Sequence, residues 1–178
     1  MHLRQPAVAG RFYTDVPADL RAEVESFLKQ GAALPASALA AGDAAHLAGL
    51  MLPHAGHVYS GRVIGATLAH VRLPRTVFLL CPNHTGLGTP LSVWPAGAWQ
   101  TPLGPVPVDG EMARLLCEAD EDFSADVMGH VREHSIEVLL PFLQVCAGDA
   151  PLHVVPVCVG TGQAPVLRTA GQRLDRKS

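Results

Sequence analysis

The chain has 178 residues, of which 48% are hydrophobic and 16% charged, so it can bury the core of about one folded domain. Its formal net charge is −3 at pH 7 and it has no basic cluster, which argues against binding of nucleic acid or of a membrane surface. The start has no continuous apolar signal segment, and no apolar run approaches the roughly 20 residues of a membrane span, so we expect a cytoplasmic protein.

The four cysteines are scattered along the chain and form no C-x-x-C pair. This spacing argues against a zinc ribbon or a redox motif and favours reduced, mostly buried thiols. They are Cys81, Cys117, Cys146 and Cys158.

The first predicted element is an amphipathic helix over residues 14–31. Thr14 and Asp15 are candidate caps, Pro17 falls in the first turn, and apolar residues recur along one face until Gly31. Residues 32–45 are small and interrupted by proline and glycine, which predicts a loop.

A strand, a helix and a second strand are predicted next. The apolar run at 47–52 and the sequence "TVFLLC" at 76–81 are the strands, and residues 61–71 are the helix. This order is typical of a βαβ unit, whose two strands lie parallel.

The remaining sequence continues the alternation of strands and helices. Residues 88–108 are rich in proline and glycine and predict short strands with turns. Helices are predicted at 109–120, behind a cap at Asp109, and at 134–146, where Pro141 must kink the helix or lie near its first turns. Residues 152–160 predict a strand, and the tail could start another helix. We therefore expect a single α/β domain over 1–178, with a mostly parallel central sheet flanked by helices.

A histidine follows each of the strands predicted at 47–52 and 76–81. His54 and His84 stand two and three residues beyond these strands, each after a proline and before a glycine-containing turn. Ligands gather beyond the carboxyl ends of parallel strands, so neighbouring strands would bring the two imidazoles together. Paired imidazoles suit iron, zinc or copper, which makes both residues candidate metal ligands. The alternative for each is a hydrogen-bonded loop residue.

A second cluster of chemistry-bearing residues lies in "HVREHSIE". On a helix, His130, Glu133, His134 and Glu137 would share one face, and the first three match the H-x-x-E-H pattern of a zinc peptidase. That pattern arises easily by chance, so we favour Glu133 and His134 as a polar cluster at the same pocket as His54. Glu137 could instead act at a helix N-terminus. Cys81 could be a soft ligand beside His84, but it is more often a small buried hydrophobe.

Six motifs together resemble the Memo family, whose bacterial and archaeal members are called AmmeMemoRadiSam system protein B. They are "AVAGRFY", "PHAGHVYSG", "CPNHTG", "TPLGPVPVD", "EHSIEVLLPFLQ" and "VVPVCVG", in the family's order, within residues 6–162. The resemblance implies an α/β fold similar to the class III extradiol (LigB-type) dioxygenases, with a metal-type pocket at the sheet edge. It also implies partnership with a radical SAM protein and an AMMECR-type protein.

The resemblance also implies roles for individual residues. His54 and His84 match the family's two metal-site histidines, while Glu133 and His134 fall on its "EHS" motif. We expect His134 to act as acid or base and Glu133 to orient it or to supply a carboxylate ligand. We expect three further residues in the pocket: His57, which stands where the family usually has tyrosine, together with Asn83 and Ser135.

Family chains continue through an "SSD...H" strand end and a later cysteine, which this sequence does not contain. We therefore expect a C-terminally truncated chain, with weakened or lost metal affinity and an exposed sheet edge covered by a partner or a second copy. Two functions stay open at this point. One is a dioxygenase-like or redox metalloprotein that holds iron or copper, with zinc less favoured. The other is a non-catalytic partner-binding protein or degenerate fragment; a zinc peptidase through His130 is a weaker third.

Overall fold

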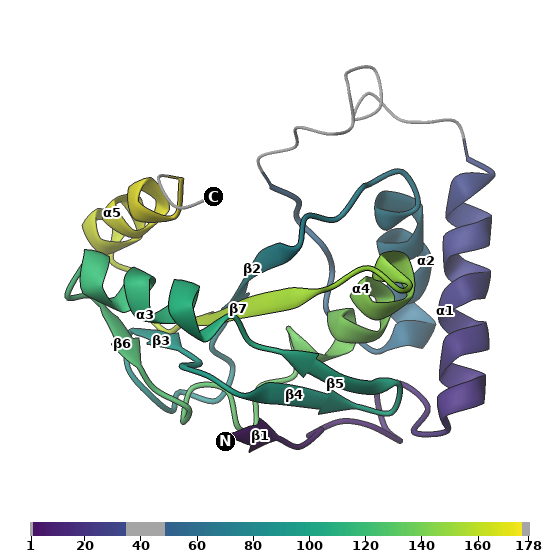
Figure 1. Cartoon of the computed structure of the whole chain (residues 1–178), viewed down its shortest axis with the longest axis horizontal. Helices are drawn as coiled ribbons and strands as arrows, with labels where there is room; N and C mark the ends of the chain where they lie inside the picture. The colour runs from purple at the N-terminus through teal and green to yellow at the C-terminus, as the bar shows by residue number, and fades with distance from the viewer. Residues whose placement is uncertain (1, 35–48, 176–178) are drawn as a thin grey trace.

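The computed structural model describes residues 2–34 and 49–175. They form two β-sheets surrounded by helices, which confirms the α/β class (Figure 1). The larger sheet has the order β2-β7-β3-β6, made of β2 (Thr76–Pro82), β7 (His153–Val159), β3 (Leu91–Val93) and β6 (Phe123–Ala125). The smaller sheet has the order β1-β4-β5, made of β1 (Leu3–Arg4), β4 (Ala98–Thr101) and β5 (Gly104–Pro107).

Both sheets are mixed, although one mostly parallel sheet was expected. In the larger sheet, β2 and β7 run parallel, as do β3 and β6, whereas β3 and β7 are antiparallel. Strand β7 lies inside the sheet, between β2 and β3. Its residues 154–158 are all buried, as expected of a strand covered on both faces.

Helices cover both faces of the larger sheet (Figure 1). The core on one face includes side chains of α1 (Pro17–Ala32), α2 (His57–Leu68), α4 (Leu140–Ala147) and the smaller sheet. The core on the other face includes side chains of α3 (Gly110–Ala119) and α5 (Ala164–Asp175). Among the described residues, no helix combines the length and the apolar character needed to cross a membrane.

Helix α1 confirms the predicted amphipathic helix, with Leu20 and Val24 fully buried. Its cap differs from the prediction, because Val16 is the N-cap and makes no side-chain cap bond. The helix packs closely on α2, and a Cβ on Gly65 of α2 would lie 2.5 Å from the Phe27 carbonyl oxygen. Glycine is therefore required there for the two backbones to approach.

The predicted βαβ unit is wrong in its first strand. Residues 49–52 form no strand, while 47 and 48 lie outside the described residues, as does most of the loop predicted at 32–45. Among the described strands, β2 pairs with β7 alone and forms an edge of the sheet. Helix α2 also begins four residues earlier than expected, at His57.

The other predicted elements are confirmed, although the helix predicted at 134–146 begins later, as a 3-10 turn at Glu137 and as an α-helix at Leu140. Strands β3, β4 and β5 lie in the region 88–108, and the Asp109 carboxylate caps α3 by accepting a hydrogen bond from the Met112 amide. A 3-10 turn at Glu137–Leu139 precedes α4, whose first turn contains Pro141, where its missing N–H costs no helical hydrogen bond. Strand β6 was not predicted.

Candidate metal centre

His54 lies in the segment that leads into α2. Gly56 is the N-cap of α2, and the Ser60 hydroxyl donates to the Ala55 carbonyl oxygen at 2.7 Å. The His57 amide donates to the Phe12 carbonyl oxygen at 2.8 Å, which ties this turn to the N-terminal part of the chain. The position of His54 therefore depends on the start of a helix and on contacts to distant residues, and not on the end of a strand.

His84 lies in the loop that follows β2. The Asn83 side-chain oxygen accepts hydrogen bonds from the Thr85 amide at 3.0 Å and the Gly86 amide at 2.8 Å, and Gly86 has a positive φ of 68°. Such a turn is typical of asparagine followed by glycine. Asn83 therefore shapes the loop that carries His84 and lies beside the site as its scaffold.

His134 lies in the irregular segment between β6 and the 3-10 turn. Its ring contacts the edge of the Phe12 ring, with centroids 5.0 Å apart. The rings of His134 and His84 stack with centroids 4.8 Å apart, and the ring of His54 lies 5.2 Å from His84 and 5.8 Å from His134. The structure thus brings together the two predicted ligands and adds a third imidazole.

The three histidines offer one ligand nitrogen each, and these atoms all lie within 4.8 Å of one another. His54 and His134 are half-buried, while His84 is more exposed. Three imidazoles at this separation form a donor set that suits zinc, copper or iron.

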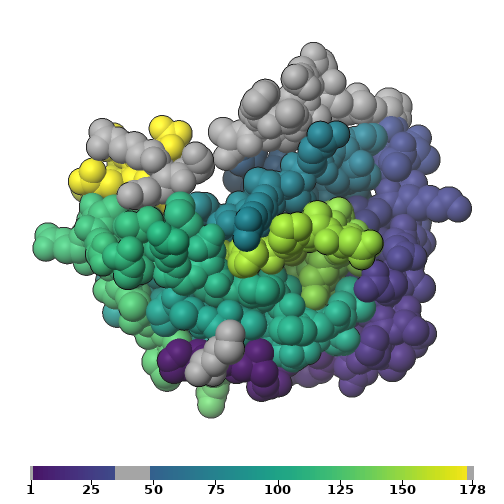
Figure 2. Space-filling view, viewed as in Figure 1, coloured from purple at the N-terminus to yellow at the C-terminus, as the bar shows by residue number. Residues whose placement is uncertain are grey.

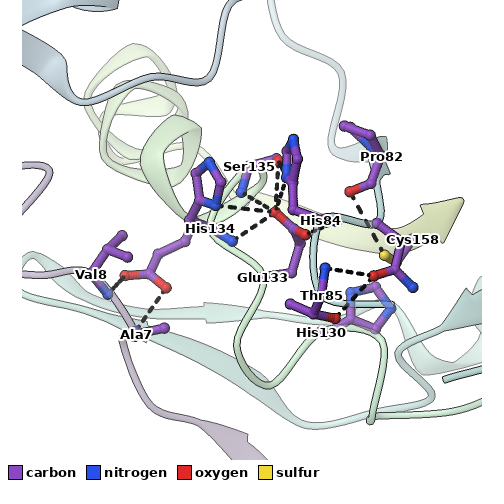
Figure 3. A network of polar contacts seen from close by, with 12 residues as sticks. Ala7, Val8, Pro82, His84, Thr85, His130, Glu133, His134, Ser135 and Cys158 are labelled. Carbon is purple, nitrogen blue, oxygen red and sulfur yellow. Dashed lines mark hydrogen bonds and ion pairs between the residues drawn. The ribbon is translucent and has the colours of Figure 1, made fainter. Parts of the chain in front are cut away.

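Glu133 is the acceptor that organises the cluster (Figure 3). Its carboxylate is buried and accepts hydrogen bonds from His84 Nδ1 at 2.9 Å and from the His84 amide at 2.7 Å. The same carboxylate accepts bonds from the His134 amide at 2.9 Å and from the Ser135 amide and hydroxyl at 3.1 and 2.8 Å. Because His84 Nδ1 is engaged, Nε2 is the ring nitrogen left for a ligand.

The pKa values at the cluster follow from burial and these hydrogen bonds. Burial alone would raise the pKa of Glu133, but the hydrogen bonds from His84 and Ser135 outweigh it and lower the pKa to about 2. Burial lowers the pKa of His134, and the neighbouring His84 and His54 lower it further against the opposing charge of Glu133. At neutral pH the site therefore combines an ionised carboxylate with a neutral His134 imidazole.

His57 does not line this site, contrary to expectation. Its ring is buried, with Nε2 2.9 Å from the Val138 carbonyl oxygen and Nδ1 3.2 Å from a carboxylate oxygen of Glu23. It also stacks on Tyr13, with ring centroids 5.2 Å apart. Both ring nitrogens are engaged, one by α1 and one by the 3-10 turn before α4, so His57 is not available as a ligand.

The zinc-peptidase pattern is not formed, because the segment from His130 to His134 is not helical. His130 is fully buried between Trp94 and Trp99, and its Nε2 lies 2.9 Å from the Ser92 carbonyl oxygen. Burial lowers its pKa to about 4. His130 is thus a core residue that lies outside the histidine cluster.

Cys81 is buried in β2, in register with Cys158 of β7. Its pKa is raised by its hydrogen bond with Cys158 and by burial, so it remains a thiol. It is not part of the histidine cluster, which agrees with the view of Cys81 as a small core residue.

An open groove of about 1470 Å³ lies beside the cluster. His54 and His134 line it together with β2, the segment 49–56, α2 and the end of α5. Figure 2 shows a notch between α5, in yellow, and the blue-green surface of β2 and α2. The groove exposes large apolar side chains, including Met51 (94% exposed), Tyr59 (83%) and Leu80 (53%).

A buried ion pair near the site was not predicted from the sequence. Arg4 of β1 and Glu137 form an ion pair with 2.7 Å between Nη1 and Oε2. No local pattern signals this pair, since the residues are 133 positions apart in the sequence.

Comparison with known proteins gives a consistent result over nearly the whole chain. A family model described as Memo-like protein matches residues 4–177. A MEMO1 family protein of Desulfurococcus amylolyticus is 40% identical over 173 residues, which cover 94% of this chain and 60% of the relative. MEMO1 family proteins of Thermotoga neapolitana and Methanopyrus kandleri are 40% and 39% identical, over 88% and 96% of this chain.

The chain spans about 60% of the length of these relatives, whose covered shares are 60%, 58% and 61%. The match nevertheless includes the segments that carry His54, His84 and His134. On this evidence the chain belongs to the Memo family.

Proposed function

We propose that this Memo-family protein binds a metal ion, iron or copper, through His54, His84 and His134. The observation that supports the proposal is the convergence of three imidazole nitrogens within 4.8 Å of one another. His134 thereby takes the role of a third ligand, where the sequence suggested an acid or base.

The hydrogen bonds of the histidine cluster are those expected of metal-binding imidazoles. A metal-binding histidine commonly donates its other ring N–H to a carboxylate, which fixes the tautomer and the orientation of the ring. Glu133 accepts such a bond from His84 Nδ1 at 2.9 Å, and its Oε1 lies 3.3 Å from His134 Nδ1. Glu133 therefore acts as the orienting carboxylate for two ligands and is not itself a ligand in this proposal.

A bound iron or copper ion would supply redox chemistry at the end of the apolar groove. The chain's own residues would hold the ion and admit an apolar molecule beside it, since Phe12, Leu139 and Pro53 line the groove near His54 and His134.

The test is elemental analysis of the purified chain beside a His54→Ala, His84→Ala double variant, before and after incubation with Fe²⁺, Cu²⁺ or Zn²⁺. We expect near-stoichiometric iron or copper in the wild type and little in the double variant. His2→Ala is the matched control, because it removes an exposed imidazole outside the cluster. Metal-free wild type after all three incubations would contradict the proposal, and stoichiometric zinc alone would change the metal assignment.

A second candidate function is partner binding at the edge of β2, with a second copy of this chain as the partner. Strand β2 forms an edge of its sheet, carries no charged residue, and lies along the groove with its exposed apolar side chains. Uncharged apolar edges are prone to pair with another strand. The radical SAM and AMMECR-type partners stay predictions.

Light scattering during size-exclusion chromatography tests this second function. We expect twice the chain mass of 18.8 kDa for the wild type and a shift towards the single mass for Leu80→Lys. Leu3→Lys adds the same charge at an exposed leucine on the other sheet and should leave the mass unchanged. A wild type that stays monomeric at high concentration would contradict self-association.

A further inference from the structure

Arg4 is a buried cation that the proposed metal site does not use directly. It is 3% exposed, and its guanidinium carbon lies 4.1 Å from the centroid of the Trp99 ring. Its Nε donates to the His130 carbonyl oxygen at 2.9 Å, and its Nη2 donates to the Glu133 carbonyl oxygen at 2.5 Å. One planar side chain therefore holds two backbone positions of the segment that carries Glu133 and His134.

The third contact of Arg4 anchors the far end of the same segment. Its Nη1 donates to the Glu137 carboxylate at 2.7 Å. This fully buried carboxylate also accepts hydrogen bonds from the amides of Ala7 and Val8 at 2.8 and 2.9 Å and from the Tyr13 hydroxyl at 2.8 Å. The buried charges compensate each other, and residues 4–13 hold both ends of the segment 130–137.

The segment between these anchors has little regular structure of its own. The Glu133 amide donates to the His130 carbonyl oxygen at 3.2 Å, and within this segment the first helical residue is Glu137, where the 3-10 turn begins. The Glu133 carboxylate nevertheless accepts the hydrogen bond of His84 Nδ1 from another loop. Its position thus depends on the groups that hold its backbone, and Arg4 is the side chain that does so.

We infer that Arg4 is a positioning residue for the histidine cluster, acting through the backbone of Glu133. By fixing Glu133, Arg4 fixes the tautomer of His84 and the place of His134. The part of this inference that concerns metal affinity rests on the proposed function; the part that concerns the His84 tautomer does not.

Arg4→Lys is the informative substitution. Lysine keeps the positive charge beside Glu137, but its single ammonium group lacks the planar fork that reaches three acceptors at once. If Arg4 served only to neutralise Glu137, lysine would serve as well. If Arg4 positions Glu133, the segment loses its anchors and the His84 hydrogen bond weakens.

The first measurement needs no metal. Side-chain ¹⁵N NMR of the imidazoles reports which ring nitrogen carries the proton, and we expect wild-type His84 to be protonated at Nδ1. In Arg4→Lys we expect a mixture of tautomers at His84, while the buried His57 is unchanged. An unchanged His84 signal in Arg4→Lys would overturn the inference.

The second measurement is Zn²⁺ affinity by calorimetry, with Zn²⁺ as the probe ion. We expect Arg4→Lys to bind about 10- to 100-fold more weakly, the usual effect of losing an outer-shell partner of a metal ligand. If the wild type binds no Zn²⁺, Fe²⁺ or Cu²⁺ while Arg4→Lys shows the tautomer change at His84, the proposed metal function is refuted and the positioning role is supported.

Two controls separate positioning from loss of stability. Leu20→Ala removes a fully buried side chain of α1 and changes no hydrogen bond of Arg4 or Glu133, so it should lower stability and leave both readouts unchanged. If Leu20→Ala changes both readouts as much as Arg4→Lys, the inference is overturned. Should Arg4→Lys fail to fold, the Arg4→Gln, Glu137→Gln double variant removes both buried charges together and must show the same change at His84.

Discussion

The carboxylate of Glu133 should make a large, pH-dependent contribution to the free energy of unfolding. Its pKa is about 2 in the folded chain against an ordinary value of 4.5. A difference of this size corresponds to about 3 kcal/mol, since one pKa unit is worth about 1.4 kcal/mol. Because the folded pKa is the lower one, this stability is fully present above the unfolded pKa and is lost as the pH falls through the folded pKa.

The perturbation that isolates this effect is Glu133→Gln, which keeps the size of the side chain and removes its charge. Urea unfolding of both proteins between pH 3 and pH 7 gives the difference in free energy of unfolding at each pH. We expect wild type to be the more stable by about 3 kcal/mol at pH 7, with about 2 kcal/mol of that difference lost by pH 3.

The exposed Glu121→Gln serves as the control, and its difference from wild type should stay within about 0.5 kcal/mol throughout. A Glu133→Gln difference that is flat between pH 3 and pH 7 would refute the reasoning, because the hydrogen bonds from His84 and Ser135 would then not favour the ionised form of Glu133.

Three further substitutions follow from the packing. His130 is buried as the neutral form with a folded pKa of about 4, so its contribution to the free energy of unfolding is present above pH 6.5 and is lost towards pH 4. His130→Gln should remove that part of the pH dependence in urea unfolding and leave Zn²⁺ affinity within twofold. A larger loss of Zn²⁺ affinity would contradict the view of His130 as a core residue outside the metal site. Gly65→Ala would place a methyl group 2.5 Å from the Phe27 carbonyl oxygen, so we expect a lower thermal midpoint, and an unchanged midpoint would show that α1 and α2 can separate at no cost. Phe142→Ala, at a fully buried site that contacts Phe27, should cost about 3–5 kcal/mol in urea unfolding, and a cost below 1 kcal/mol would contradict the packing described.

The elements that could be predicted are those in which the hydrophobic pattern is local. Helix α1 follows from the spacing of Leu20, Val24 and Phe27, and β2 and β7 follow from short runs of strand-forming residues. The run at 47–52 misled because its described part, residues 49–52, forms an unpaired wall of the groove. Whether such a segment becomes a strand depends on a partner strand, which periodicity does not reveal.

The candidate site also has features that local sequence patterns reveal and features that depend on distant residues. A histidine after proline, followed by a turn with glycine, identified His54 and His84, and the motif "EHS" drew attention to Glu133 and His134. The local pattern suggested that Glu133 serves its neighbour His134, and its carboxylate does lie 3.3 Å from His134 Nδ1. What the pattern did not reveal is that the same carboxylate accepts a hydrogen bond from His84, 49 residues away. His57 stands three residues after His54, but as the first residue of α2 it faces the core, where its ring contacts Glu23 of α1 and the Val138 carbonyl of the 3-10 turn.

The sequence by itself determined the α/β class, the main helices and strands, and two of the three imidazoles that could hold a metal, His54 and His84. Only the tertiary structure decided that His134 joins His54 and His84, that Glu133 orients His84, and that Arg4 holds Glu133 from 129 residues away. The physical reason is the range of the interactions. Helix caps and apolar periodicity act between residues a few positions apart, whereas hydrogen bonds to a buried carboxylate or guanidinium form wherever the packed core brings donors and acceptors together.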